Sequence, residues 1–291
     1  MPITTHTLET RGAEIVYDIH GPLPYADGRP RLFMIGQPMA ASGFATLASL
    51  FPERAVVTYD PRGLGRSTRH GGRTDNDPAI QAEDVHAVIE ALGAGPVEMF
   101  ASSGGAVTAL ALVTAHPDDV TTLVAHEPPL IPVLPYAAAG ERARAGFRDA
   151  YQAGGRGYGT AAFIAMTSWR GEFTDEYFAQ PAADPVMFGM STEDDGTRDD
   201  PLLSDRSRAI TSYRPDVDAL ASVPTRVVIA VGEESEGTFT GRAAVATAAL
   251  LDQQAAVFPS HHGGFLGGAF GYAGQPEAFA RKLRQVLDRD T

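Results

Sequence analysis

The sequence predicts an α/β protein with a mostly parallel sheet of seven or eight strands, helices on both faces and one helical insertion. The chain has 291 residues, 44% of them hydrophobic, which is enough to bury one large core. Strand-like runs alternate with helical patterns, and such alternation is typical of parallel βαβ units. The alternation stops between about Leu130 and Pro215 and resumes at Thr225, so the intervening segment interrupts one sheet.

Short runs rich in Val, Ile and aromatic residues, bounded by Gly, Pro or Asp, predict the strands. The first two are expected to form an antiparallel hairpin at one edge of the sheet. In chain order the predicted strands are Thr4–Glu9, Glu14–Ile19, Arg31–Ile35, Arg54–Tyr59, Pro96–Ala101, Val120–Ala125, Thr225–Val231 and Gln254–Phe258. The predicted helices between and after them are Pro78–Leu92, Gly104–His116, Thr240–Leu251 and Gln275–Asp288.

The interrupting segment has helical patterns at Ala137–Ala153, Gly159–Trp169 and Ser207–Tyr213 and no strand-like run. Its acidic stretch STEDDGTRDD shows no metal-loop spacing, which favours a solvated loop. We therefore expect a core domain of residues 1–129 and 216–291 and a helical cap insertion of residues 130–215, called the cap segment below.

Composition excludes several classes of function. The chain has 23 basic and 36 acidic residues, a formal charge of −13, which argues against nucleic acid or an anionic membrane as the partner. The absence of cysteine excludes disulfides, thiolate metal sites and a cysteine nucleophile. The first residues resemble no signal peptide, and the most apolar stretch, Ala106–Ala115, is about half as long as a membrane span. We expect a cytoplasmic protein with a small-molecule partner and make no prediction of its oligomeric state.

The segment VEMFASSGGAVTAL carries the strongest catalytic signal, because a strand runs through a serine directly into a helix. A nucleophile elbow needs small residues two positions on either side of the serine, since the turn is sharp. Ala101 and Gly105 fill these positions around Ser103. Ser102 fails the same test, because Phe100 would occupy a position that admits only small residues. Ser103 is therefore the predicted nucleophile.

Five segments in order resemble the α/β-hydrolase superfamily over nearly the whole chain. LFMIGQPMAASGF resembles the H-G-x-P oxyanion loop, with Gly36, Gln37 and Pro38 matching and Ile35 in place of the histidine. YDPRGLGRS resembles the D-x-R-G-x-G-x-S segment, and DVHAVIEALG resembles the helix before the elbow. LVAHEPP resembles the strand after the elbow, and FPSHHGGF resembles the loop that carries the catalytic histidine. The resemblance implies the α/β-hydrolase fold and a Ser–His–acid triad.

The resemblance implies that His262 is the base, with His261 as its fallback, because the family's histidine lies in the loop after the last strand and is followed by small residues. The acid departs from the common pattern, since the loop VGEESEGTF after the seventh predicted strand has no Asp. Haloalkane dehalogenases are among the branches that place a carboxylate after the sixth strand, where this chain has Glu127. We expect Glu127 as the acid, with Glu234 as the alternative.

The same resemblance implies an oxyanion hole made by the backbone N–H groups of Gln37 and Gly104. Aromatic residues of the cap segment, Trp169 among them, and Met39 beside the oxyanion loop are expected to line an apolar or aromatic substrate site. No dinucleotide or P-loop fingerprint occurs, and no cofactor or metal is expected.

The function that follows is hydrolysis of a small, apolar or aromatic ester, thioester or lactone through an acyl-enzyme on Ser103. A cofactor-free haloperoxidase or perhydrolase, or a C–C bond hydrolase, could use the same triad. A non-catalytic ligand-binding protein on the hydrolase fold is an alternative of another class. Reaction of Ser103 with a fluorophosphonate separates an enzyme from a binding protein. The natural substrate is not predicted.

Overall fold

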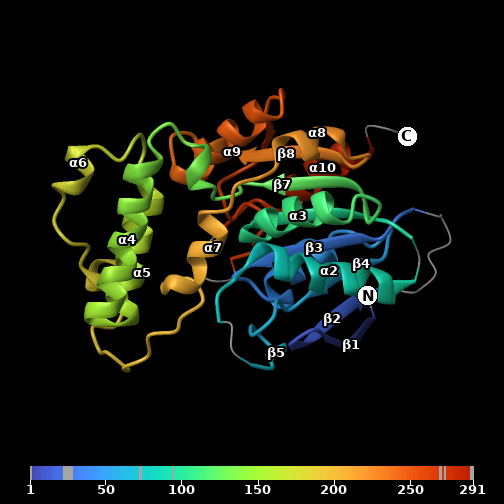
Figure 1. Cartoon of the computed structure of the whole chain (residues 1–291), viewed down its shortest axis with the longest axis horizontal. Helices are drawn as coiled ribbons and strands as arrows, with labels where there is room; N and C mark the ends of the chain where they lie inside the picture. The colour runs from blue at the N-terminus through green and yellow to red at the C-terminus, as the bar shows by residue number, and fades with distance from the viewer. Residues whose placement is uncertain are drawn as a thin grey trace.

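The computed structural model describes residues 2–21, 29–71, 74–93, 95–268, 271 and 273–288. A twisted sheet runs through the right of Figure 1 with helices on both faces, and helices of the cap segment stand to the left. The strand order is β1-β2-β4-β3-β6-β7-β8-β9, with the two-residue β5 paired to β2. The described strands are β1 (Ile3–Thr10), β2 (Ala13–His20), β3 (Leu32–Gln37), β4 (Val56–Tyr59), β5 (Thr68–Arg69), β6 (Val97–Ser103), β7 (Val120–His126), β8 (Arg226–Gly232) and β9 (Ala256–Phe258).

All neighbouring strands from β4 to β9 are parallel, whereas β2 pairs antiparallel with β1, β4 and β5. This arrangement confirms the mostly parallel sheet and the antiparallel hairpin at its edge. The central strands are mostly buried because helices cover both faces: β3 is buried at every position, β6 at five of seven and β7 at six of seven. The carboxyl ends of β3, β6, β7 and β8 consequently meet at one edge of the sheet, where this type of fold builds its sites.

Two apolar clusters lie on opposite faces of the sheet. One is formed with α2 (Pro78–Leu92), α3 (Gly104–Ala115), α8 (Val217–Ser222) and α9 (Phe239–Leu250), and the other with α1 (Ala45–Ser49) and α10 (Pro276–Leu287). The ends of α2 follow from local chemistry: the Asp77 carboxylate accepts the Ala79 N–H, and Gly93 ends the helix with a φ of 63°.

Between β7 and β8 the described chain contains helices and loops but no strand. Its elements are η2 (Ile131–Val133), α4 (Ala137–Gly154), α5 (Arg156–Ser168), α6 (Asp175–Phe178), η3 (Pro185–Phe188), η4 (Asp205–Ser207), α7 (Arg208–Thr211) and α8. Phe147, Tyr151, Met166 and Phe173 belong to a third apolar cluster, which also takes in Phe239 of α9. The predicted helix Ser207–Tyr213 is shorter in the structure, and α6 and α8 were not predicted. The domain boundaries at 130 and 215 stay a prediction.

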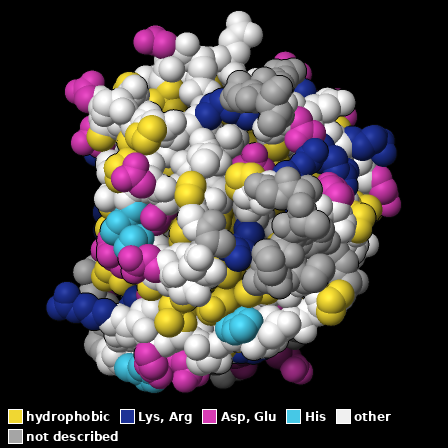
Figure 2. Space-filling model, turned by 90° about the vertical axis from the view of Figure 1, so that its right-hand side faces the viewer, with side chains coloured by type: hydrophobic (Ala, Val, Ile, Leu, Met, Phe, Trp, Pro, Cys, Tyr) yellow, Lys and Arg dark blue, Asp and Glu magenta, His cyan; other side chains and the backbone are white. Residues whose placement is uncertain are grey.

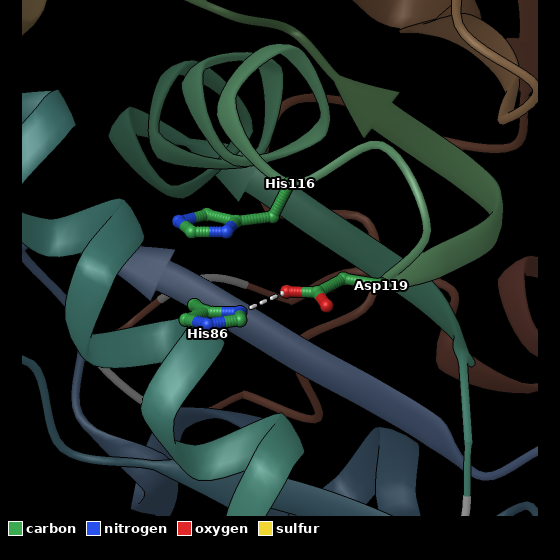
Figure 3. Close-up of side chains that lie close together, drawn as sticks. All are labelled: His86, His116 and Asp119. Carbon is green, nitrogen blue, oxygen red and sulfur yellow. Dashed lines mark hydrogen bonds and ion pairs between the residues drawn. The ribbon is translucent and has the colours of Figure 1, made fainter.

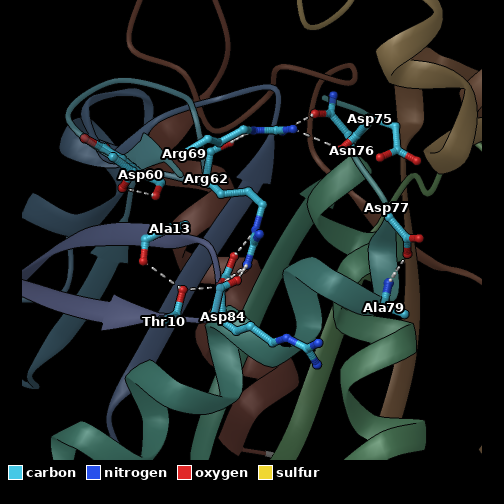
Figure 4. Close-up of polar contacts among 12 residues, drawn as sticks. Thr10, Ala13, Asp60, Arg62, Arg69, Asp75, Asn76, Asp77, Ala79 and Asp84 are labelled. Carbon is cyan, nitrogen blue, oxygen red and sulfur yellow. Dashed lines mark hydrogen bonds and ion pairs between the residues drawn. The ribbon is translucent and has the colours of Figure 1, made fainter. Parts of the chain in front are cut away.

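Ion pairs fix the loops beside the carboxyl edge of the sheet. Arg62 forms a two-pronged ion pair with the buried Asp84 of α2, at 2.6 Å for both contacts, and Asp84 also accepts the Thr10 hydroxyl (Figure 4). Asp60 accepts the Ala41 N–H at 2.8 Å, which ties the end of β4 to the loop after β3. The loop that follows Gln37 is thus held against the end of β4.

The surface shows no continuous basic patch on the face drawn in Figure 2, where basic side chains lie among acidic ones. No helix in the described ranges combines the length and the apolar character that crossing a bilayer requires.

Candidate active site

Ser103 lies where β6 ends and α3 begins, and its backbone has φ 57° and ψ −128°. Such a positive φ is costly for a residue with a side chain. The two glycines that follow allow close packing: a Cβ on Gly105 would lie 2.6 Å from the Gly36 Cα, and one on Gly104 would lie 2.7 Å from the Gln37 oxygen. The strand–turn–helix expected around Ser103 is therefore present, with Gly104 and Gly105 packed against the end of β3.

Gln37 is the last residue of β3 and is in register with Ser103 of β6. The two residues expected to supply oxyanion donors, Gln37 and Gly104, are therefore neighbours at the carboxyl edge. The Gln37 side chain is 4% exposed, and its amide has no hydrogen-bond partner among the described residues. The side chain of Met39 packs over Gly36 and joins the apolar cluster of α1 and α10.

Glu127 directly follows β7 and is completely buried. Its Oε1 accepts the Gly232 N–H at 2.9 Å, and its Oε2 accepts the Thr240 hydroxyl at 2.6 Å. The same Oε2 lies 2.7 Å from Nδ1 of His262. These three contacts hold the carboxylate in one position and place it against the predicted base.

Charge and burial act in opposite directions on Glu127. Burial raises the pKa of this carboxyl, but the hydrogen bond and charge of His262 outweigh it and hold the pKa below the ordinary value. Glu127 is therefore an anion at neutral pH. A buried anion next to an imidazole stabilises that ring when it is protonated, which is the role of a triad acid.

His126, the residue before Glu127, is completely buried, and burial lowers its pKa to about 4. The ring is neutral at pH 7. Its Nδ1 lies 3.4 Å from the Ser102 hydroxyl, and its Nε2 lies 3.9 Å from Glu127 Oε1. Four phenylalanine rings surround it, namely Phe100, Phe258, Phe265 and Phe279. A neutral ring in an apolar cage is unsuited to accept a proton at neutral pH.

The His262 side chain is 40% exposed, and with Nδ1 held by Glu127 its Nε2 is the nitrogen available to a serine. Within the described residues, the Ser103 hydroxyl has no hydrogen-bond partner, His262 included. Contacts between nucleophile and base are often long in free enzymes and shorten when substrate binds. The arrangement can thus supply a base and an orienting anion beside an elbow serine.

The remaining predicted site residues, Glu234, His261 and Trp169, make contacts outside the Glu127–His262 pair. Glu234 is exposed and contacts the Gln275 side chain at 3.4 Å. His261 Nδ1 accepts the N–H of Gly263 within its own loop. Trp169 donates its indole N–H to the Glu172 oxygen in the cap segment, and no contact joins it to Ser103 in the described structure.

Sequence reasoning missed three residues of the site. Thr240 and Gly232 bind the Glu127 carboxylate, and Ile210 of α7 lies over the elbow, its Cγ2 3.1 Å from where a Cβ on Gly104 would be. No sequence motif marks Thr240 or Ile210. Gly232 lies at the end of a predicted strand, but the partner of its N–H depends on the tertiary structure.

Comparison with known proteins gives consistent results. Residues 36–158 match a family model described as alpha/beta hydrolase fold. The uncharacterized hydrolase YraK of Bacillus subtilis is 26% identical over 100% of this chain and 98% of its own length. A proline iminopeptidase of Xylella fastidiosa is 32% identical over 33% of this chain and 31% of its own.

Two solved structures show the same fold at low sequence identity. The naproxen esterase of Bacillus subtilis has a TM-score of 0.65 at 15% identity, covering 99% of this chain and 92% of that one. A thermophilic esterase of Thermogutta terrifontis has a TM-score of 0.62 at 18% identity, covering 98% of both chains.

Proposed function

Because this chain belongs to the α/β-hydrolase superfamily, we propose that it is an esterase-like serine hydrolase that acts through an acyl-enzyme. The observation that carries the proposal is the 2.7 Å contact between His262 Nδ1 and the buried Glu127 carboxylate at the sheet edge that also bears the Ser103 elbow. Ser103 is the nucleophile, His262 the base and Glu127 the orienting acid.

In the first half-reaction His262 Nε2 takes the hydroxyl proton as Ser103 Oγ attacks the carbonyl carbon of the ester. The negative oxygen of the tetrahedral intermediate accepts hydrogen bonds from the backbone N–H groups of Gln37 and Gly104. His262 then returns its proton to the departing alcohol as the carbon–oxygen bond to the leaving group breaks. In the second half-reaction, water attacks the acyl-enzyme by the same route and releases the acid.

The surroundings of the elbow favour a small substrate with an apolar acyl or alcohol part. Ile210 covers the Gly104 side of the site, and Met39 fills the space above Gly36. The buried, unpaired amide of Gln37 favours a polar atom on the substrate near the reacting carbonyl, since a buried amide without a partner costs about 1–3 kcal/mol.

The cap segment is proposed to roof the site and to select the substrate. Most of its aromatic rings pack on one another, as do Phe147 and Phe163 or Phe173 and Tyr177, so they form the interior of this segment. Ile210, by contrast, reaches the elbow from this segment. We therefore assign substrate selection to Ile210 of α7 in preference to Trp169.

Fluorophosphonate labelling followed by peptide mass spectrometry tests the proposal. The expected product carries one phosphonyl group on Ser103, and Ser103→Ala carries none. The matched control is Ser102→Ala, which removes the neighbouring hydroxyl and should still be labelled. An inert Ser103 in folded protein would favour a ligand-binding protein, and labelling at Ser102 would show that the nucleophile is misassigned.

A further inference from the structure

Two histidines and an aspartate come together far from the active site, at the opposite end of β7. His86 lies on α2, His116 follows α3, and Asp119 immediately precedes β7, whereas Glu127 immediately follows it. Eight residues of extended chain separate Asp119 from Glu127, which corresponds to about 26 Å. One ligand-type atom from each of His86, His116 and Asp119 lies within 4.8 Å of the other two (Figure 3).

The two imidazole rings are stacked, with centroids 3.6 Å apart and an interplanar angle of 7°. Each ring has its Nε2 beside a carboxylate of α2. His116 Nε2 lies 2.9 Å from Glu83 Oε1, and His86 Nε2 lies 3.6 Å from Glu90 Oε2. Because a carboxylate only accepts, His116 donates its Nε2–H to Glu83, and its Nδ1 keeps a lone pair.

Asp119 therefore already holds one ring of the pair. Asp119 Oδ2 lies 2.7 Å from His86 Nδ1, and the Nδ1 edge of the His116 ring is on the side of Asp119 in Figure 3. A divalent cation at this place would replace the proton that His86 Nδ1 shares with Asp119 Oδ2. Metal-bound histidines characteristically pair their second nitrogen with a carboxylate, as His116 does here with Glu83.

We propose that His86, His116 and Asp119 form a binding site for a divalent transition-metal ion of the zinc class. Two imidazole nitrogens and one carboxylate oxygen suit Zn²⁺, Co²⁺ or Ni²⁺, whereas Ca²⁺ and Mg²⁺ prefer oxygen ligands alone. Three protein ligands leave a fourth position for water. The site joins α2 to the turn before β7 and lies apart from the proposed ester chemistry.

Binding requires small side-chain movements. Ligand atoms on a tetrahedral zinc ion are about 3.4 Å apart, so the present spacing must contract by up to about 1.4 Å. An imidazole points its lone pair at the ion, so the parallel rings must tilt toward each other. Both histidine side chains are 23% exposed, and Asp119 lines a hollow of about 200 Å³ together with Glu90. Solvent therefore reaches both rings and the aspartate, and an ion can approach them from the surface.

Titration of untagged, metal-stripped protein with Co²⁺ and Zn²⁺ tests this proposal. We expect one ion per chain with a Kd below about 100 µM, and a visible Co²⁺ absorption band typical of tetrahedral coordination. His86→Asn and His116→Asn should each weaken binding at least about 100-fold, and Ca²⁺ should not bind. Circular dichroism checks that the variants fold.

Two controls separate this site from other histidines. His70→Asn removes an exposed histidine that also lies near a carboxylate, 3.8 Å from Glu9, and should bind the ion like the wild type. His262→Ala removes the proposed base and should also bind normally. Absence of saturable binding to the wild-type chain would overturn the proposal, and so would loss of binding in His262→Ala or unchanged binding in folded His86→Asn and His116→Asn.

Discussion

Replacing Glu127 with Gln changes the proposed triad by one atom and removes its charge. The wild-type carboxylate accepts from Gly232, Thr240 and His262 at once. An amide has one acceptor oxygen and one donor NH₂, so it cannot accept all three bonds. If the amide donates to Nδ1, the ring proton is forced onto Nε2, the position that must receive the proton of Ser103.

Two estimates of the loss of kcat in Glu127→Gln agree to within about tenfold. A unit charge about 4 Å from the imidazolium, at an effective dielectric of about 20, contributes about 4 kcal/mol, or roughly 10³-fold in rate. The corresponding substitution in a well-studied serine protease, where it forces the wrong tautomer, lowers kcat by about 10⁴. We therefore expect Glu127→Gln to lower kcat for a p-nitrophenyl ester by about 10³ to 10⁴.

The assay is initial-rate hydrolysis of p-nitrophenyl acetate across pH, with labelling of Ser103 measured in parallel. Glu234→Gln is the matched control, because it makes the same chemical change on an exposed residue whose described side-chain contact is with Gln275 at 3.4 Å. Its rate should stay within about twofold of the wild type. If folded Glu127→Gln kept more than about a tenth of the wild-type kcat, or if Glu234→Gln showed the large defect, the assignment of the acid would be wrong.

Three further predictions concern the elbow and the buried histidine. Ser103→Ala should abolish ester turnover without loss of secondary structure, whereas Ser102→Ala should have a mild effect; turnover above the hydroxide background in Ser103→Ala would contradict the triad. Gly105→Ala should lower the free energy of unfolding by about 1–3 kcal/mol in denaturant titrations, because its Cβ would lie 2.6 Å from the Gly36 Cα; unchanged stability would refute the close packing. His126 is neutral when folded, so it should contribute stability above its unfolded pKa of 6.5 that is lost as pH falls to about 4, a change of about 3 kcal/mol. Denaturant titrations at several pH values should show a flatter dependence in His126→Asn, and an equally steep one would contradict the buried neutral ring.

Local pattern was sufficient to predict most of the sheet and its covering helices. Strands and helices repeat their side-chain directions with different periods, and both periods can be recognised in the spacing of apolar residues along the sequence. The two-residue β5 and the one-turn helices α6 and α7 are too short to have a period, so the sequence could not predict their bounds. The early start of α5, at Arg156 after Gly155, was missed because Gly155 to Gly159 includes three glycines, which disfavour a helix.

The sequence predicted those parts of the candidate site whose defining residues are adjacent in the chain. The elbow is such a segment, since Ala101 to Gly105 encode both the turn and the serine. The choice between Glu127 and Glu234 depends on where Thr240 and Gly232 point, which requires long-range packing. Ile210 illustrates the same limit, because it reaches Gly104 across more than a hundred residues of chain.

The backbone conformation of Ser103 lowers the stability of the fold, whereas its side chain is needed for the proposed reaction. Its φ of 57° with a ψ of −128° belongs to a region that glycine adopts freely, and a serine there costs about 1–3 kcal/mol. A glycine at this position would relieve that cost and remove the nucleophile in the same step. Selection for thermal stability alone would therefore favour glycine over serine at this position. A serine that is kept under selection for stability would indicate that the reaction is selected as well. A library of variants screened for heat resistance should accordingly enrich inactive chains at position 103.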